Sequence, residues 1–151
     1  MFDKYTIEAN KLAMAIDIAI EAIQKFPPKD YLSEHVHQFI KVYQDTKEAC
    51  LNPEARFRNL ASLKYSRNDI LIFFQESSGK AVEYFWENIK INNIDYPREN
   101  KLAKVLKRGK INNKTEYDFV VDVIVPYQQE LLINQEQAAL LSKMIGDFEL
   151  R

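Results

Sequence analysis

Apolar residues recur every three or four positions along most of this chain, and that spacing limits its fold more than any other feature of the sequence. Residues 3–26 carry one such apolar stripe, which ends before Pro27-Pro28. Steps of three and four place side chains on one face of an α-helix. Proline lacks a backbone N–H and disfavours helical geometry in the residue before it, so the pair should end this first helix. The stripe contains Tyr5, Ala9, Leu12, Ile16, Ala19, Ile20, Ile23 and Phe26.

The same spacing predicts a second and a third helix. Asp30 is a candidate N-cap for a helix whose stripe fades at Leu51. Asn52-Pro53 then joins a capping residue to a proline suited to the first helical position, which predicts a short helix from about Pro53. The stripe of the second helix contains Leu32, Val36, Phe39, Ile40, Tyr43 and Cys50.

Residues 69–94 are the most aromatic stretch of the chain and the expected centre of its core. They include Trp86, the only tryptophan. Aromatic side chains bury more area than other side chains, so a dense cluster of them indicates a core. A helix should begin near Ser66 and end or bend at Gly79, with a residue of Ser77-Ser78 capping the next helix.

Three more helices are predicted in the last third of the chain. A short basic helix from about Arg98 to Arg108 should stop at Gly109. Residues 119–125 (FVVDVIV) are ambiguous, because β-branched residues favour strands. Helical spacing continues past them and a lone strand would have no partner, so we predict a helix that Pro126 kinks or divides. Its predicted inward face is Tyr117, Val120, Val121, Ile124, Gln128 and Leu131, and the N-cap signals are Asn113 here and Asn134 before the last helix.

Size and composition fit one domain without a membrane span. A length of 151 residues lies within the common range of about 100–200 for a domain. Three glycines disfavour a sheet with many tight turns. We predict an all-α, single-domain bundle of six to seven helices with short connections over residues 1–151. A single cysteine, no signal-peptide pattern and no long apolar run predict a cytoplasmic protein without a membrane partner.

Few patterns in the sequence point to catalysis. His35 and His37 are the only histidines, and at this spacing on a helix they point about 200° apart, so they should not share a metal ion. Ser77 and Lys80 have the spacing of a Ser–Lys nucleophile pair but lack its companion motifs. We therefore expect no metal site, no cofactor and no catalytic residue.

Charge is segregated in the last third of the chain. Residues 98–114 carry seven Lys and Arg against Glu99 alone, whereas residues 115–149 are acidic apart from Lys143. A smaller basic group lies at residues 56–67. Either the basic segment packs beside the acidic helices and the charges cancel, or one of the two surfaces meets a partner of opposite charge.

These patterns leave three functions open. We favour a non-catalytic domain that binds another protein, for instance an immunity protein that neutralises a toxin by direct binding. The alternative is nucleic-acid binding through the basic segments 56–67 and 98–114. The third is a small enzyme that combines two carboxylates with a histidine. The candidate partner-binding residues are Lys104, Lys107, Arg108, Lys110, Asp118 and Asp122.

Overall fold

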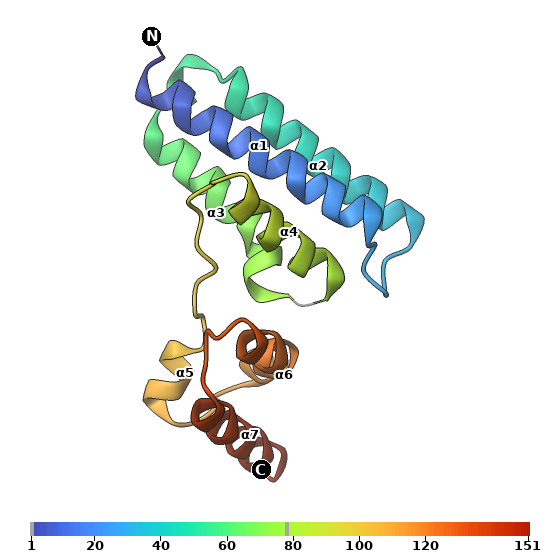
Figure 1. The fold of residues 1–151 in the computed structure, drawn as a ribbon, viewed down its shortest axis with the longest axis vertical. Helices are drawn as coiled ribbons and strands as arrows, with labels where there is room; N and C mark the ends of the chain where they lie inside the picture. Colours follow the sequence, from blue (N-terminus) through green and yellow to red (C-terminus); the bar gives the residue numbers. More distant parts are fainter. Residues whose placement is uncertain (1, 78) are drawn as a thin grey trace. The chain divides into compact units, whose positions relative to one another are not determined.

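The computed structural model describes residues 2–77 and 79–151, and every regular element in them is helical (Figure 1). This confirms the predicted all-α class and the predicted six to seven helices. None of the described helices is long and apolar enough to span a bilayer. The elements are α1 (Lys4–Lys25), α2 (Ser33–Leu51), the 3₁₀ turn η1 (Ala55–Phe57), α3 (Leu60–Glu76), α4 (Lys80–Ile91), α5 (Ala103–Arg108), α6 (Lys114–Gln129) and α7 (Gln135–Glu149).

The described residues form two compact units, each with its own hydrophobic cluster. The first unit comprises residues 2–74 and 80–96, and the second comprises residues 75–77, 79 and 97–151. The cluster of the first unit draws on α1 to α4, and that of the second draws on α5 to α7. Whether the two units behave as the single domain predicted from the sequence stays a prediction.

Helix α1 is the central element of the first unit, where it packs against both α2 and α4 (Figure 1). The Asp3 carboxylate accepts a hydrogen bond of 2.8 Å from the Thr6 N–H and so caps the helix. Because α1 packs against two helices, it has a buried face towards each of them. Small residues of α1 such as Ala15 and Ala19 are fully buried. The predicted stripe is therefore present but forms part of a wider buried surface, and Phe26 alone in it is exposed.

The aromatic segment lies in the hydrophobic cluster of the first unit, whereas the sequence predicted it at the centre of one core for the whole chain. The Trp86 ring is 4% exposed, and its Nε1–H donates a hydrogen bond of 2.7 Å to the Phe74 carbonyl oxygen. Phe85 stacks on Phe74 with ring centroids 4.0 Å apart. This cluster joins α3 to α4, which Gly79 separates with φ +111°, a value that L side chains rarely adopt. The suggested cap at Ser78 lies outside the described residues.

The N-terminus of α2 differs from the prediction. The helix begins at Ser33 and Asp30 does not cap it. Instead the imidazole Nδ1 of His35 accepts a hydrogen bond of 3.0 Å from the Leu32 N–H. A histidine at this position takes the part that an acidic or amide side chain plays in a capping box, which the sequence pattern did not suggest.

The segment between α2 and α3 also differs from the prediction. The helix expected from Pro53 is only the 3₁₀ turn η1, none of whose residues is buried. Helix α3 starts at Leu60 rather than near Ser66. The Asn59 side chain accepts a hydrogen bond of 2.9 Å from the Ser62 N–H, so an Asn cap upstream of the predicted one sets the start.

Residues 119–125 are helical, which confirms the prediction from spacing over the strand preference of the residues. Helix α6 runs through Pro126 to Gln129 without being divided. Its inward face is rotated from the prediction, since the buried residues are Val120, Val123 and Tyr127. Val121 is exposed, and the predicted face member Leu131 lies beyond the helix end and is 87% exposed.

Candidate functional site

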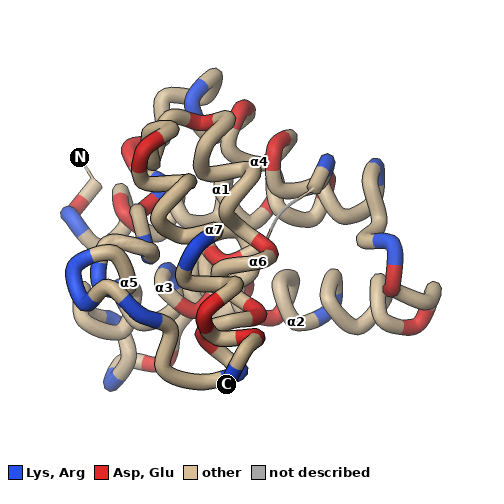
Figure 2. The backbone as a smooth tube through the Cα atoms, turned by 90° about the horizontal axis from the view of Figure 1, so that it is seen from below, with Lys and Arg blue, Asp and Glu red and all other residues tan. Residues whose placement is uncertain are grey.

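The basic candidates lie on α5 and the turn after it, in the second unit. Helix α5 begins at Ala103, whereas the sequence predicted a helix from about Arg98. Residues 98–102 are not helical. Leu102 and Val105 are buried, so the helix packs by one face. Gly109 ends it with φ 85°, as predicted, and its N–H donates to the Val105 carbonyl oxygen. Figure 2 shows the Lys and Arg positions gathered along α5 and this turn.

Arg108 is directed back onto the turn itself. Its guanidinium forms an ion pair with the Glu116 carboxylate, and its Nε donates a hydrogen bond of 3.0 Å to the Lys110 carbonyl oxygen. Glu116 also accepts a hydrogen bond of 2.9 Å from the Asn112 N–H. Burial alone would raise the pKa of Glu116, but the hydrogen bonds from Asn112 and Arg108 outweigh it and lower the pKa. Arg108 therefore fixes the shape of the turn.

The start of α6 is fixed equally well. The Asn113 side chain accepts a hydrogen bond of 2.8 Å from the Glu116 N–H, which confirms the predicted N-cap. Ile111 is 1% exposed and inserts into the hydrophobic cluster of the second unit. The turn between α5 and α6 is thus held by a cap, an ion pair and a buried side chain.

Within the second unit, four of the seven cations of residues 98–114 are in ion pairs. Their partners are carboxylates of the same unit, so the expected cancellation of charge occurs for this subset. The pairs are Arg98–Glu130, Lys101–Glu99, Arg108–Glu116 and Lys114–Asp118. Arg98 is 5% exposed at its side chain and also donates to the Ser77 carbonyl oxygen, so it is unavailable to a partner.

The remaining three cations are Lys104, Lys107 and Lys110, which we call the lysine ridge. All three are exposed, and no ion pair among the described residues includes them. Lys104 and Lys107 lie one turn apart on α5, so they share a face of the helix. The ridge is thus a set of uncompensated positive charges on a well-defined turn.

The acidic candidates lie on the exposed face of α6. Asp118 is paired with Lys114 at 2.9 Å, whereas Asp122 is exposed and belongs to no ion pair among residues 2–77 and 79–151. Val121 and Val125 are 43% and 57% exposed on the same face of this helix. One carboxylate and two apolar side chains therefore remain for a partner on this face.

The residues suggested for the third, enzymatic function lie in different units. Asp118 and Asp122 belong to the second unit, whereas His35 and His37 lie on α2 in the first. The ring of His35 is engaged at the start of α2. No group of His, Cys, Asp and Glu suited to a metal ion occurs among the described residues.

One residue that positions the site was not suggested by the sequence. Gln75 is a polar residue that is only 6% exposed. Its amide donates to the Pro97 carbonyl oxygen at 2.9 Å and accepts from the Glu99 N–H at 2.8 Å. These bonds hold the segment that leads into α5. An isolated glutamine after an aromatic run carries no sequence signal for such a role.

The comparisons with known proteins add no assignment. No family model, curated protein or solved structure matches the chain. The lysine ridge and the exposed face of α6 are therefore interpreted by their own chemistry.

Proposed function

We propose that this chain is a non-catalytic domain that binds a partner protein through an acidic surface of that partner. The observation that carries the proposal is the lysine ridge. Its three charges are exposed and have no ion-pair partner within the described residues, whereas Arg108 is paired with Glu116 and stabilises the turn. A surface charge without an internal partner is the kind that acts on an approaching molecule.

The rigidity of the turn supports recognition as well as attraction. A capped helix start, a left-handed glycine and a buried isoleucine fix the backbone that presents the ridge. A surface that is already ordered loses less entropy when it binds. Charges held in place also select partners by repelling surfaces of the wrong sign.

The exposed face of α6 can supply contact area in the same unit. Val121 and Val125 offer apolar surface, and Asp122 offers one negative charge. Charged side chains at the rim of an interface mainly raise the association rate, whereas apolar contacts at its centre slow dissociation. We propose the toxin-neutralising form as one instance, in which the bound protein is an enzyme whose surface beside the active site is acidic.

The experiment compares the wild-type chain with the triple variant Lys104→Glu, Lys107→Glu and Lys110→Glu. Partners are first captured from native lysate with the wild-type chain, and association and dissociation rates are then measured by surface plasmon resonance at low and high salt. We expect the association rate at low salt to fall by about tenfold or more, because electrostatic guidance raises such rates by factors of about 10–10³. The dissociation rate should change less.

The matched control reverses three exposed lysines of the first unit, Lys29, Lys41 and Lys90. This control changes the net charge of the chain by the same amount but keeps Lys104, Lys107 and Lys110. A loss of association rate that occurs only in the ridge variant is therefore a local effect of the ridge. Equal association rates for the ridge variant and the wild-type chain at low salt would overturn the proposal. So would equal losses in the ridge variant and the control.

Nucleic-acid binding is the competing outcome of the same test. It is weakened by the pairing of basic residues, because in the smaller group Arg56 pairs with Glu54 and Arg58 pairs with Asp3. A complex with RNA or DNA in a gel-shift assay at low salt, with an affinity that falls steeply as salt rises, would favour it over the protein partner.

A further inference from the structure

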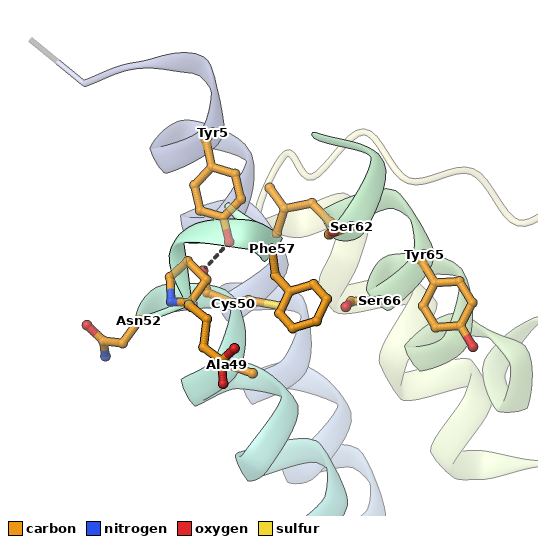
Figure 3. Close-up of a pocket in the computed structure, with 11 residues that line it drawn as sticks. Tyr5, Ala49, Cys50, Asn52, Phe57, Ser62, Tyr65 and Ser66 are labelled. Atoms are coloured by element: carbon orange, nitrogen blue, oxygen red, sulfur yellow. Dashed lines mark hydrogen bonds between the residues drawn. The ribbon is translucent and has the colours of Figure 1, made fainter. Parts of the chain in front are cut away.

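A concave region lies wholly within the first unit. It is a cavity of about 640 Å³ between the end of α2, the turn η1 and the first half of α3. Figure 3 shows Tyr5 of α1 on one side, Ser62 and Ser66 of α3 on another, and the Phe57 ring beside the Cys50 sulfur between them. Cavities of about 300–1,000 Å³ are the size that encloses a small organic ligand.

The backbone around the cavity is already fixed. The Tyr5 hydroxyl donates a buried hydrogen bond of 2.8 Å to the Cys50 carbonyl oxygen, which ties the start of α1 to the end of α2. The Asn59 cap fixes the start of α3. A preformed cavity is typical of ligand sites, because little conformational entropy is lost when a ligand binds to residues that are already ordered.

The Phe57 ring forms part of the wall. The Arg56 guanidinium lies over it at 4.6 Å from the ring centroid and is not among the lining residues, so one face of the ring is left for a ligand. Phe57 lies in η1, which buries none of its residues, and its side chain is 49% exposed although it lines the cavity. Leu63 forms part of the same lining and is 6% exposed. A flat ring could stack on Phe57 while it covers apolar surface.

Glu54 is the one charged residue among the described residues that line the cavity, and its carboxylate is paired with Arg56 at 2.9 Å. Burial raises the pKa of the Cys50 thiol and of the Tyr5 hydroxyl, so both groups are neutral at pH 7. The cavity therefore offers no uncompensated charge to a charged ligand.

A few polar groups face the cavity from one wall. Ser62 and Ser66 lie one turn apart on α3, and both line the cavity. A serine hydroxyl donates one hydrogen bond and accepts others, so the two can orient a polar atom of a ligand. We infer that this cavity binds an uncharged small molecule that contains an aromatic ring, with the ring on Phe57 and a polar atom towards the serines.

The test uses two probes with the same ring system, neutral N-phenyl-1-naphthylamine and its anionic counterpart 8-anilinonaphthalene-1-sulfonate. Both fluoresce more strongly in an apolar site, so titration of the full chain gives an affinity for each. We expect the neutral probe to bind more tightly. Phe57→Ala should weaken its binding about tenfold, because an aromatic pair contributes up to about 1.5 kcal/mol.

Two further variants separate loss of the site from loss of the fold. Ser62→Trp fills the cavity without removing a packed apolar side chain, so it should abolish binding while the circular-dichroism spectrum stays helical. Phe26→Ala removes an exposed aromatic ring of the same unit that does not line the cavity, and it should leave the affinity unchanged.

Cys50 locates the bound probe, because it is the only cysteine of the chain and it lines the cavity. N-phenyl-1-naphthylamine at a concentration that half-saturates the wild-type chain should slow the alkylation of Cys50 by iodoacetamide, and the same concentration should slow it much less in the Phe57→Ala variant. Four results would overturn the inference: no binding of the neutral probe, equal binding by the anionic probe, no effect of Phe57→Ala, or no protection of Cys50.

Discussion

The carboxylate of Asp3 caps α1 and also meets Arg58, so its protonation reports on both contacts. Hydrogen bonds from the Thr6 N–H and the Thr6 hydroxyl, followed by that from Arg58, lower the pKa of Asp3 from 3.8 to about 2. We expect carboxyl ¹³C NMR titration to give this value. Arg58→Ala should raise the pKa only part of the way, because the two contributions of Thr6 remain.

The same shift gives a direction for acid stability. The pKa of Asp3 is lower in the folded chain than in the unfolded chain, so its contribution is present above about pH 4 and is lost as the pH falls towards 2. Lys47→Ala, which removes the partner of Asp17 instead, should leave the pKa of Asp3 unchanged. A full return to 3.8 in Arg58→Ala would show that the helix cap contributes nothing.

Two buried tyrosine hydroxyls allow a matched comparison. Tyr5 donates to the Cys50 carbonyl oxygen at 2.8 Å, and Cys50 lies in the last turn of α2, where carbonyls have no helical partner. Tyr43 donates at 2.6 Å to the carbonyl oxygen of Ile70, which lies inside α3 and keeps its helical bond. In urea unfolding, Tyr5→Phe should cost about 1–3 kcal/mol and Tyr43→Phe about 0.5–1.5 kcal/mol. The reverse order would contradict this account.

At the scale of the elements, two glycines of the second unit should respond oppositely to alanine. Gly109 has φ +85° with open space around its Cβ position, so Gly109→Ala should cost about 1–2 kcal/mol through backbone strain alone. Gly146 lies inside α7 with ordinary helical φ and open space, so Gly146→Ala should stabilise by about 1 kcal/mol. Thermal unfolding followed by circular dichroism measures both. A loss of stability in Gly146→Ala would contradict the helical assignment there.

Local signals in the sequence were enough for the elements that depend on neighbouring residues. The Asn113 cap and the Gly109 stop are set within one helical turn, and both were predicted. Spacing identified residues 119–125 as helix, because periodicity extended beyond the β-branched run. The orientation of that helix was predicted less well. Tyr127 is fully buried in the hydrophobic cluster of the second unit, whereas Leu131, which the prediction placed on the inward face, is exposed.

The candidate site was predictable only in part. Exposure of Lys104 and Lys107 follows from an amphipathic α5, so the sequence indicated it. The role of Arg108 depends on its ion pair with Glu116, which lies eight residues further along the chain and is placed beside Arg108 by the turn between α5 and α6. The amino-acid composition of the segment does not predict that contact. The hydrogen bonds of Gln75 join residues more than twenty positions apart, which no local pattern can indicate.

At the scale of the whole molecule, helix α3 belongs to both units. Phe74 is part of the hydrophobic cluster of the first unit, whereas Gln75 belongs to the second. The Tyr127 hydroxyl donates to the Gln75 carbonyl oxygen at 3.2 Å, within the second unit. Because α3 continues from Phe74 to Gln75, a change at Gln75 can test whether the two units unfold together. The single domain predicted from the sequence stays a prediction until that test is made.

Gln75→Ala tests whether the two units unfold as one. It leaves the Pro97 carbonyl and the Glu99 N–H without their partner, which should cost about 1–3 kcal/mol. Trp86 fluorescence follows the first unit in urea, and NMR signals of α6 and α7 follow the second. A single domain requires one midpoint for both probes, lowered equally by Gln75→Ala, and the exposed Gln44→Ala should change neither. Two midpoints, with only the second lowered by Gln75→Ala, would show instead that the chain is two domains.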